Sequence, residues 1–179
     1  MPRYIALLRG VNVGGHVVKM NRLRELFEEM GLKRVETFIA SGNVIFEATS
    51  KSAESLEKRI ESHLERSLGY AVATFLRTDG ELARISAHAA FEDSGEHSLY
   101  IGFLKAQPSN ASRAKLMAHR TKLDEFQVNE REAYWLCRTR MSDSAFFRVG
   151  LERALGMAAT VRNSTTVAKL AGKYPCKNG

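Results

Sequence analysis

Apolar and polar residues follow two kinds of pattern along this chain, one typical of strands and one of helices. Residues 4–9 form a compact apolar run without helical spacing, which predicts a buried strand that ends at Gly10. Residues 23–30 instead carry apolar side chains at i, i+3, i+4 and i+7. This spacing predicts an amphipathic helix, with Asn21 as its N-cap and Gly31 just beyond its end.

A β-hairpin and a second helix are predicted next. Residues 35–40 and 44–47 are rich in β-forming residues and are joined through residues 41–43. The glycine and asparagine of this Ser-Gly-Asn link are expected to supply the positive φ angles of a tight turn. Leucine or isoleucine then recurs at every fourth position over residues 56–68, which predicts a helix that Gly69 closes.

The first half is completed by one more strand. A β-rich run over residues 71–77 gives the order β-α-β-β-α-β, in which two helices cover one face of an antiparallel sheet. Thr78 and Glu81 form a T-x-x-E capping box for a further short helix. The polar residues 92–96 are then predicted to be a loop that separates two halves.

The order of elements starts again after this loop, although no residue-level repeat accompanies it. The elements predicted there are a strand over 99–104, a helix over 109–120, a hairpin of 126–128 with 133–138, a helix from near Ser144 to Gly156 with Phe147 on its apolar face, and residues 160–163 leading into a short helix. We therefore expect an α+β fold of two ferredoxin-like β-α-β-β-α halves, whose antiparallel sheets are covered by helices. The N-terminal half is predicted to span residues 1–95, and the C-terminal half, with its basic tail, residues 96–179.

Composition places the chain among ordinary globular proteins. It has 179 residues, of which 44% are hydrophobic and 26% are charged. No apolar run approaches the roughly 20 residues that span a bilayer, so we expect no membrane association. Cys137 and Cys176 offer neither a zinc-binding spacing nor a disulfide framework. Free thiols and a cytoplasmic location are the corresponding predictions.

Positive charge is concentrated near the end of the chain. The formal net charge is +7 and the isoelectric point about 9.6. From Arg138 onward, eight basic residues face two acidic ones, which gives this segment +6. Such clustering favours anionic partners, nucleic acid or a phosphorylated metabolite. A solvated surface with a basic tail is the alternative interpretation.

Three segments together resemble a known family. They are residues 7–15 (Leu-Leu-Arg-Gly-Val-Asn-Val-Gly-Gly), 37–46 (Thr-Phe-Ile-Ala-Ser-Gly-Asn-Val-Ile-Phe) and 162–170 (Arg-Asn-Ser-Thr-Thr-Val-Ala-Lys-Leu). In combination they are similar to a bacterial family of unknown function, the one numbered 1697 (DUF1697). The resemblance implies paired ferredoxin-like halves and no established activity. Ser164 stands where the resemblance leads us to expect an aromatic residue, commonly tryptophan, so a stacking role does not carry over to that position.

The glycine-rich segment 10–16 is the first candidate site, because it joins a strand to a helix. Free backbone N–H groups and a helix dipole in this setting favour an anion. Gly10 and Gly15 have the G-x-x-x-x-G spacing, but His16-Val17 replaces the Lys-Ser/Thr pair of a P-loop, which argues against a nucleotide triphosphatase. A purely structural loop remains the alternative.

The second candidate site is the segment 162–166, Arg-Asn-Ser-Thr-Thr, which precedes a predicted helix and is predicted to clamp a phosphate. Asn163 or Ser164 is equally well explained as an N-cap. The candidate binding residues of both sites and of the hairpin turn are Arg9, Asn12, Gly14, Gly15, His16, Lys19, Ser41, Asn43, Arg162, Asn163, Thr165 and Lys169.

Other chemistries lack their usual motifs. The sequence contains neither an H-E-x-x-H nor a G-x-S-x-G motif, and the five histidines show no metal-ligand spacing. We therefore name no catalytic residue, metal or cofactor, and we interpret His63 as a packing residue on a helix flank. The predicted function is an anion-binding module for phosphate or nucleic acid. The alternatives are an enzyme acting on a small phosphorylated molecule between the halves, and a protein-interaction module.

Overall fold

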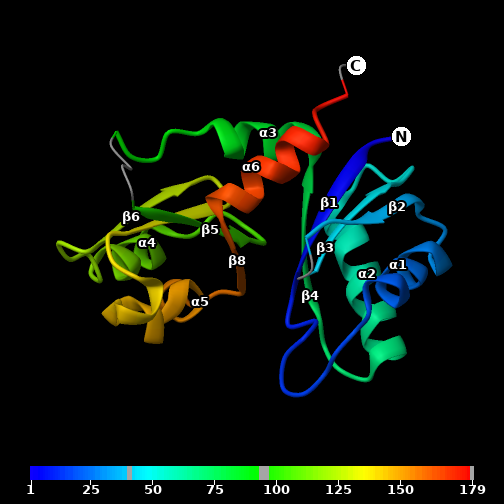
Figure 1. Ribbon diagram of the computed structural model, residues 1–179, viewed down its shortest axis with the longest axis horizontal. Helices are drawn as coiled ribbons and strands as arrows, with labels where there is room; N and C mark the ends of the chain where they lie inside the picture. The colour runs from blue at the N-terminus through cyan, green and yellow to red at the C-terminus, as the bar shows by residue number, and fades with distance from the viewer. Residues whose placement is uncertain (40–41, 93–96, 178–179) are drawn as a thin grey trace. The chain divides into compact units, whose positions relative to one another are not determined.

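The computed structural model describes residues 1–39, 42–92 and 97–177 (Figure 1). The chain packs into two compact units, of which one comprises Met1–Ala83 together with the chain from Leu170 onward, and the other comprises Arg84–Lys169. Each unit contains a four-stranded antiparallel sheet. The predicted α+β class with two similar halves is confirmed.

The predicted division at residues 95 and 96 differs from this grouping of packed residues. Residues from Arg84 onward pack with the second unit, and the chain returns to the first unit at Leu170. The division of the chain into halves of residues 1–95 and 96–179 stays a prediction. Apart from Glu92, the polar loop expected over 92–96 lies outside the described residues.

The first unit has the strand order of a ferredoxin-like sheet. Its elements are β1 (Arg3–Arg9), α1 (Met20–Glu29), β2 (Lys33–Thr37), β3 (Asn43–Glu47), α2 (Ala53–Leu68) and β4 (Ala73–Thr78). The sheet order is β2-β3-β1-β4, with β1 antiparallel to both of its neighbours. The two central strands are β1, which the sequence predicted from an apolar run, and β3, which it predicted as the second strand of a hairpin.

The helices α1 and α2 cover one face of this sheet (Figure 1). Phe27 of α1 meets Phe46 of β3 with ring centroids 5.6 Å apart, and Tyr4 stacks on the same Phe46 ring at 5.8 Å. Ile60 and Leu64 of α2 are fully buried in this core. The fourfold spacing of apolar residues in α2 therefore marks the stripe that faces the sheet.

The ends of α1 and α2 follow the predictions at all but one position. Gly31 has a φ of +79° just after α1, and Gly69 ends α2 with a φ of +83°. The N-cap of α1 is not Asn21, which lies inside the helix, but Lys19, whose side chain makes no capping bond. Ser52 caps α2 by accepting a hydrogen bond from the N–H of Ser55 at 3.3 Å.

The β2–β3 hairpin closes differently from the prediction. Gly42 does adopt a positive φ of +77°, but Asn43 does not, and among the described residues of the hairpin link the other left-handed residue is Ile39, at +53°. Asn43 is instead the buried first residue of β3, and its side-chain amide donates to the carbonyls of Phe38 and Ile39 at 3.1 and 3.3 Å. Ser41 lies outside the described residues.

The second unit repeats the order of elements. They are β5 (Ser98–Leu104), α4 (Asn110–Met117), β6 (Asp124–Asn129), β7 (Glu132–Cys137), α5 (Gly150–Leu155) and β8 (Ala159–Asn163), with the sheet order β6-β7-β5-β8. α4 and α5 cover one face of this sheet (Figure 1). Two further helices, α3 (Asp79–Ala87) and α6 (Ser164–Lys173), each contain residues of both units.

The helix predicted from Ser144 to Gly156 is interrupted. Two short 3₁₀ turns, Met141–Asp143 and Ala145–Arg148, precede α5. Gly150, the first residue of α5, has a φ of +76°, a left-handed conformation that glycine adopts readily but that a continuous α-helix does not contain. The break changes which aromatic residue faces the core, because Phe146 is 3% exposed and the predicted Phe147 is 50% exposed.

Two general expectations can be compared with the structure. No helix in the described ranges is long and apolar enough to cross a membrane. Cys137 is buried, Cys176 is exposed, and both are free thiols. Burial raises the pKa of the Cys137 thiol, so this side chain is inert core.

Candidate functional site

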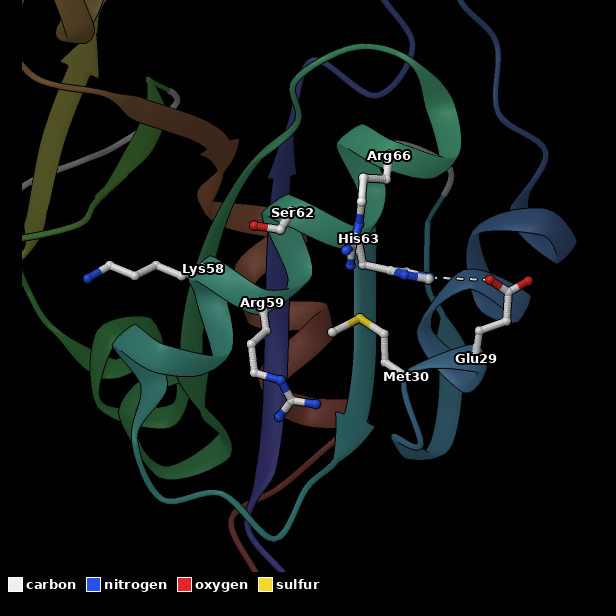
Figure 2. A pocket seen from close by; sticks show the side chains of 7 residues that line it. All are labelled: Glu29, Met30, Lys58, Arg59, Ser62, His63 and Arg66. Atoms are coloured by element: carbon white, nitrogen blue, oxygen red, sulfur yellow. Dashed lines mark ion pairs between the residues drawn. The ribbon is translucent and has the colours of Figure 1, made fainter.

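A basic hollow of about 410 Å³ lies on the surface of the first unit, between α1 and α2 (Figure 2). Its lining residues are Glu29, Met30, Lys58, Arg59, Ser62, His63 and Arg66. Four of these seven side chains are basic or can become so, and one is acidic. The hollow thus offers positive charge at a concave surface, whose walls can contact an anion from more than one side.

The helical repeat of α2 explains why its cations gather there. Arg59, His63 and Arg66 are spaced i, i+4 and i+7, so they lie on one flank of the helix next to the buried stripe of Ile60 and Leu64. Figure 2 shows these three side chains on the side of α2 that faces Met30, while Lys58 extends in another direction.

Two of these cations have no counter-ion among the residues that the structure describes. Within the described part of the chain, neither Arg59 nor Arg66 takes part in a hydrogen bond or ion pair. Lys58, by contrast, is held by Glu54, with Nζ 2.7 Å from Oε1. The two arginines are also exposed, so both guanidinium groups are available to a ligand.

The acidic residue of the hollow is already neutralised. Glu29 accepts a hydrogen bond from Arg22 at 2.9 Å, and this bond is the main reason why its pKa is lowered. Its second oxygen lies 3.2 Å from His63 Nε2, a contact that becomes an ion pair when the imidazole is protonated. Glu29 therefore orients His63 without cancelling the charge of Arg59 and Arg66.

In the predicted glycine-rich site, the side chains of Asn12 and His16 already contact other residues of the first unit. The Asn12 side chain accepts a hydrogen bond from the Val18 N–H at 2.8 Å, and the His16 ring stacks on Tyr70 with centroids 4.1 Å apart. The Tyr70 hydroxyl in turn donates to the Val11 carbonyl at 2.7 Å. These contacts favour the structural interpretation of the loop, and its anion-binding role stays a prediction.

The other predicted residues of the first unit lie around this loop. Arg9 is the exposed last residue of β1, Gly14 and Gly15 are exposed at φ +60° and +83°, and Lys19 is the exposed residue before α1. The hairpin turn reaches the start of the loop, because the Gly42 carbonyl accepts a hydrogen bond from the Leu8 N–H at 2.8 Å. Two of the three family-like segments therefore meet in the structure.

The predicted site at residues 162–169 belongs to the second unit. Arg162 donates to the Thr160 hydroxyl at 2.8 Å, and burial lowers the pKa of its guanidinium to about 10. Asn163 accepts from the Thr165 N–H at 2.8 Å, as expected of a residue at a helix start. Thr165 and Lys169 are exposed on α6. Phosphate binding by this segment stays a prediction.

The sequence analysis missed the two arginines of the hollow. The i, i+4, i+7 spacing of Arg59, His63 and Arg66 was a signal for a basic helix flank. The hollow itself also requires Glu29 and Met30 at the end of α1, whose position depends on how the two helices pack. The structure describes no cluster of three or more His, Cys, Asp or Glu side chains that would hold a metal ion.

A comparison with known protein families shows to which family the chain belongs. The sequence profile of a family described as "Protein of unknown function (DUF1697)" matches residues 1–134. The chain belongs to this family. The basic hollow and the glycine-rich loop both lie in the matched part, whereas residues 162–170 lie beyond it. Family membership brings no assigned activity.

A solved structure confirms the fold. A conserved bacterial protein from Streptococcus pneumoniae matches with a TM-score of 0.75 and 21% sequence identity, over 97% of this chain and 98% of that one. At this identity the likeness concerns the fold alone. No curated protein matches the chain.

Proposed function

We propose that this protein binds a phosphate-bearing anion in the basic hollow between α1 and α2. The observation that carries the proposal is the pair of exposed guanidinium groups, Arg59 and Arg66, on one flank of α2 without a counter-ion among the described residues. Arginine suits phosphate because its planar group presents parallel N–H donors to the phosphate oxygens.

The hollow is a better candidate than the glycine-rich loop for the same chemistry. In the loop, Asn12 and His16 are engaged by Val18 and Tyr70. In the hollow, the two arginines have no ion-pair partner among the described residues. Glu29 is the one acidic residue of the lining, and it already forms an ion pair with Arg22. An enzymatic role has no comparable support, because no observation identifies a reacting group in the hollow.

Substitution of the arginines tests the proposal. Binding of inorganic phosphate, a nucleoside monophosphate and a short single-stranded oligonucleotide is measured by calorimetry or fluorescence anisotropy at low salt. A charge-assisted hydrogen bond contributes about 1.5–3 kcal/mol, so Arg59→Ala or Arg66→Ala is expected to weaken binding roughly ten- to a hundredfold. Both residues are exposed, so neither variant is expected to unfold.

Lys58→Ala is the matched control, because it removes a cation from the same helix that Glu54 already holds. We expect less than about a threefold effect from it, in keeping with the small contribution of exposed ion pairs. The proposal fails if none of the three probes binds more tightly than about millimolar. It also fails if Arg9→Ala or Arg162→Ala weakens binding while both α2 variants bind normally, since the ligand would then occupy the sites predicted from the sequence.

A further inference from the structure

From Leu170, within α6, the chain packs with the first unit again, and the segment that follows α6 is held there like a bound peptide. We call residues Tyr174–Lys177 the tail segment; its sequence is Tyr-Pro-Cys-Lys. Tyr174 is 6% exposed, so its side chain is buried against the rest of the first unit. The contacts of this segment with the first sheet explain that burial.

Three side chains of the first unit contact the first residue of the tail segment. The Tyr174 hydroxyl donates to Glu36 Oε2 at 2.7 Å. Its ring packs edge-on against Phe38 with centroids 6.0 Å apart, and the Arg3 guanidinium lies 5.9 Å from the ring centroid. A buried aromatic ring with a paired hydroxyl is the usual form of an anchor in peptide recognition.

The backbone of the tail segment is recognised as well. The Pro175 carbonyl accepts a hydrogen bond from Arg3 Nη1 at 3.0 Å, and the Lys177 N–H donates to Asp79 Oδ2 at 3.2 Å. Arg3 and Asp79 are themselves 3.7 Å apart. The ion pair of Arg3 and Asp79 thus binds both a carbonyl and an N–H group of the tail-segment backbone.

A buried carboxylate holds the last residue. The Lys177 ammonium donates to Glu47, which is 5% exposed and also pairs with Arg34 at 3.2 Å. These contacts, the Lys177 hydrogen bond first among them, lower the pKa of Glu47. A hollow of about 230 Å³ remains beside Tyr174, so the tail segment leaves part of the surface uncovered.

We propose that this surface is a peptide-binding groove of the first unit, occupied in this chain by its own tail segment. The groove is built from Arg3, Glu36, Glu47 and Asp79. The ligand it selects is a short peptide with tyrosine, proline and, two residues further on, lysine. The hydrogen bonds to two backbone groups position the peptide, and the contacts of the tyrosine and lysine side chains determine which sequences the groove prefers. This inference is independent of the phosphate site on α2.

Binding in trans tests the groove. The probe is a fluorescent peptide of residues 171–177 in which serine replaces Cys176, and the chain ending at Lys173 is compared with the full chain. The peptide is expected to bind the shortened chain and to bind the full chain at least tenfold more weakly. In the full chain, the tethered tail segment competes for the groove at an effective concentration of about a millimolar. Peptides with Tyr174→Ala or Lys177→Ala are expected to bind at least tenfold more weakly than the parent peptide. Equal binding to both chains, or no binding to a shortened chain that is folded by circular dichroism, would overturn the proposal.

The full chain provides a second test that does not depend on the shortened one. Hydrogen exchange of the Lys177 amide is expected to be slowed in the wild type, because Asp79 accepts its hydrogen bond. Lys177→Ala and Glu47→Gln are expected to speed this exchange at residue 177 at least tenfold while the core of the first unit stays protected. Lys169→Ala removes an exposed cation of α6 outside the groove and is expected to change nothing. Wild-type exchange at the rate of a free peptide, or unchanged exchange in both groove variants, would contradict the proposal.

Discussion

Gly42 shows how one residue fixes the contact between the hairpin turn and the glycine-rich loop. It combines a φ of +77° with a close approach, because a Cβ added there would lie 3.0 Å from Leu8 Cβ and 3.4 Å from Val11 Cγ2. Gly42→Ala is therefore expected to cost about 1–3 kcal/mol of unfolding free energy, from backbone strain and collision together. Denaturant unfolding measures it. Gly69→Ala is the control, since Gly69 has a φ of +83° but no neighbour within 4 Å. Equal losses in the two variants would mean that the contact with Leu8 is unimportant.

In the second unit, a buried carboxylate, that of Asp124, fixes hydrogen bonds in the core. Its buried carboxylate accepts hydrogen bonds from Trp135 Nε1 at 2.8 Å and from the Ser144 hydroxyl at 2.9 Å. Asp124→Ala leaves both donors unpaired in the core, which is expected to cost about 2–5 kcal/mol. Trp135 is the sole tryptophan of the chain, so its fluorescence follows unfolding of this unit. Asp143→Ala serves as the control, because Asp143 forms an exposed pair with Arg140. A loss as small as that of the control would contradict the assignment.

At the residue scale, the sequence predicts conformation better than contact. Gly42 was expected in a turn, because glycine tolerates a positive φ wherever the turn lies. The bonds of Asn43 to Phe38 and Ile39 were not expected, because those carbonyls come together only in the folded hairpin. The arginines of the hollow were missed for a similar reason. Their spacing is local, but the hollow they line needs another helix.

At the scale of elements, agreement depends on whether local signals are consistent. α2 was predicted closely because its apolar repeat and its final glycine agree. The segment 144–156 was wrongly predicted as one helix, because the prediction rested on its apolar spacing, which does not register the backbone conformation of Gly150. In the structure, the left-handed conformation of Gly150 separates α5 from the 3₁₀ turn before it.

The tail segment is an element whose attachment depends on pH. Burial, and then the hydrogen bond to Glu36, raise the pKa of Tyr174 well above its ordinary value. A group whose folded pKa is raised stabilises the folded form fully below its unfolded pKa, about 10 for tyrosine, and loses this contribution as the pH rises further. The tail segment is therefore expected to detach above about pH 10.

Fluorescence anisotropy of a dye on the exposed Cys176 measures this detachment, because Cys137 is buried and does not react. The anisotropy of the wild type is expected to fall above about pH 10 as the tail segment is released. Tyr174→Phe keeps the ring but lacks the hydroxyl, and all other titrating groups are common to both proteins. The Tyr174-dependent step is expected to be absent in this variant. Identical pH curves would show that the Tyr174 hydroxyl does not govern the attachment.

At the scale of the whole molecule, the order of elements was sufficient to predict two antiparallel sheets. The order β-α-β-β-α-β is compatible with few topologies, and both sheets have the same one. The return of the chain to the first unit was not predicted, since it depends on pairs such as Tyr174 with Glu36, which are 138 residues apart. Likewise, the basic tail was expected to act through its charge, yet Lys177 is bound by Glu47.

The net charge of +7 makes salt dependence the most informative property of the whole protein. If the ligand is a single-stranded nucleic acid, log affinity falls linearly with log salt, with a slope of about −0.7 for each phosphate contacted. Removing Arg59 and Arg66 together is then expected to make the slope shallower by about 1.4, because two contacts are lost. The slope is obtained from anisotropy titrations of a short oligonucleotide between about 50 and 200 mM salt, with Lys58→Ala as the control. A small phosphorylated ligand held in the hollow would give a shallower slope than the oligonucleotide in the wild type. A steep slope that the double substitution leaves unchanged would place the nucleic acid on another basic surface and exclude the hollow as its site.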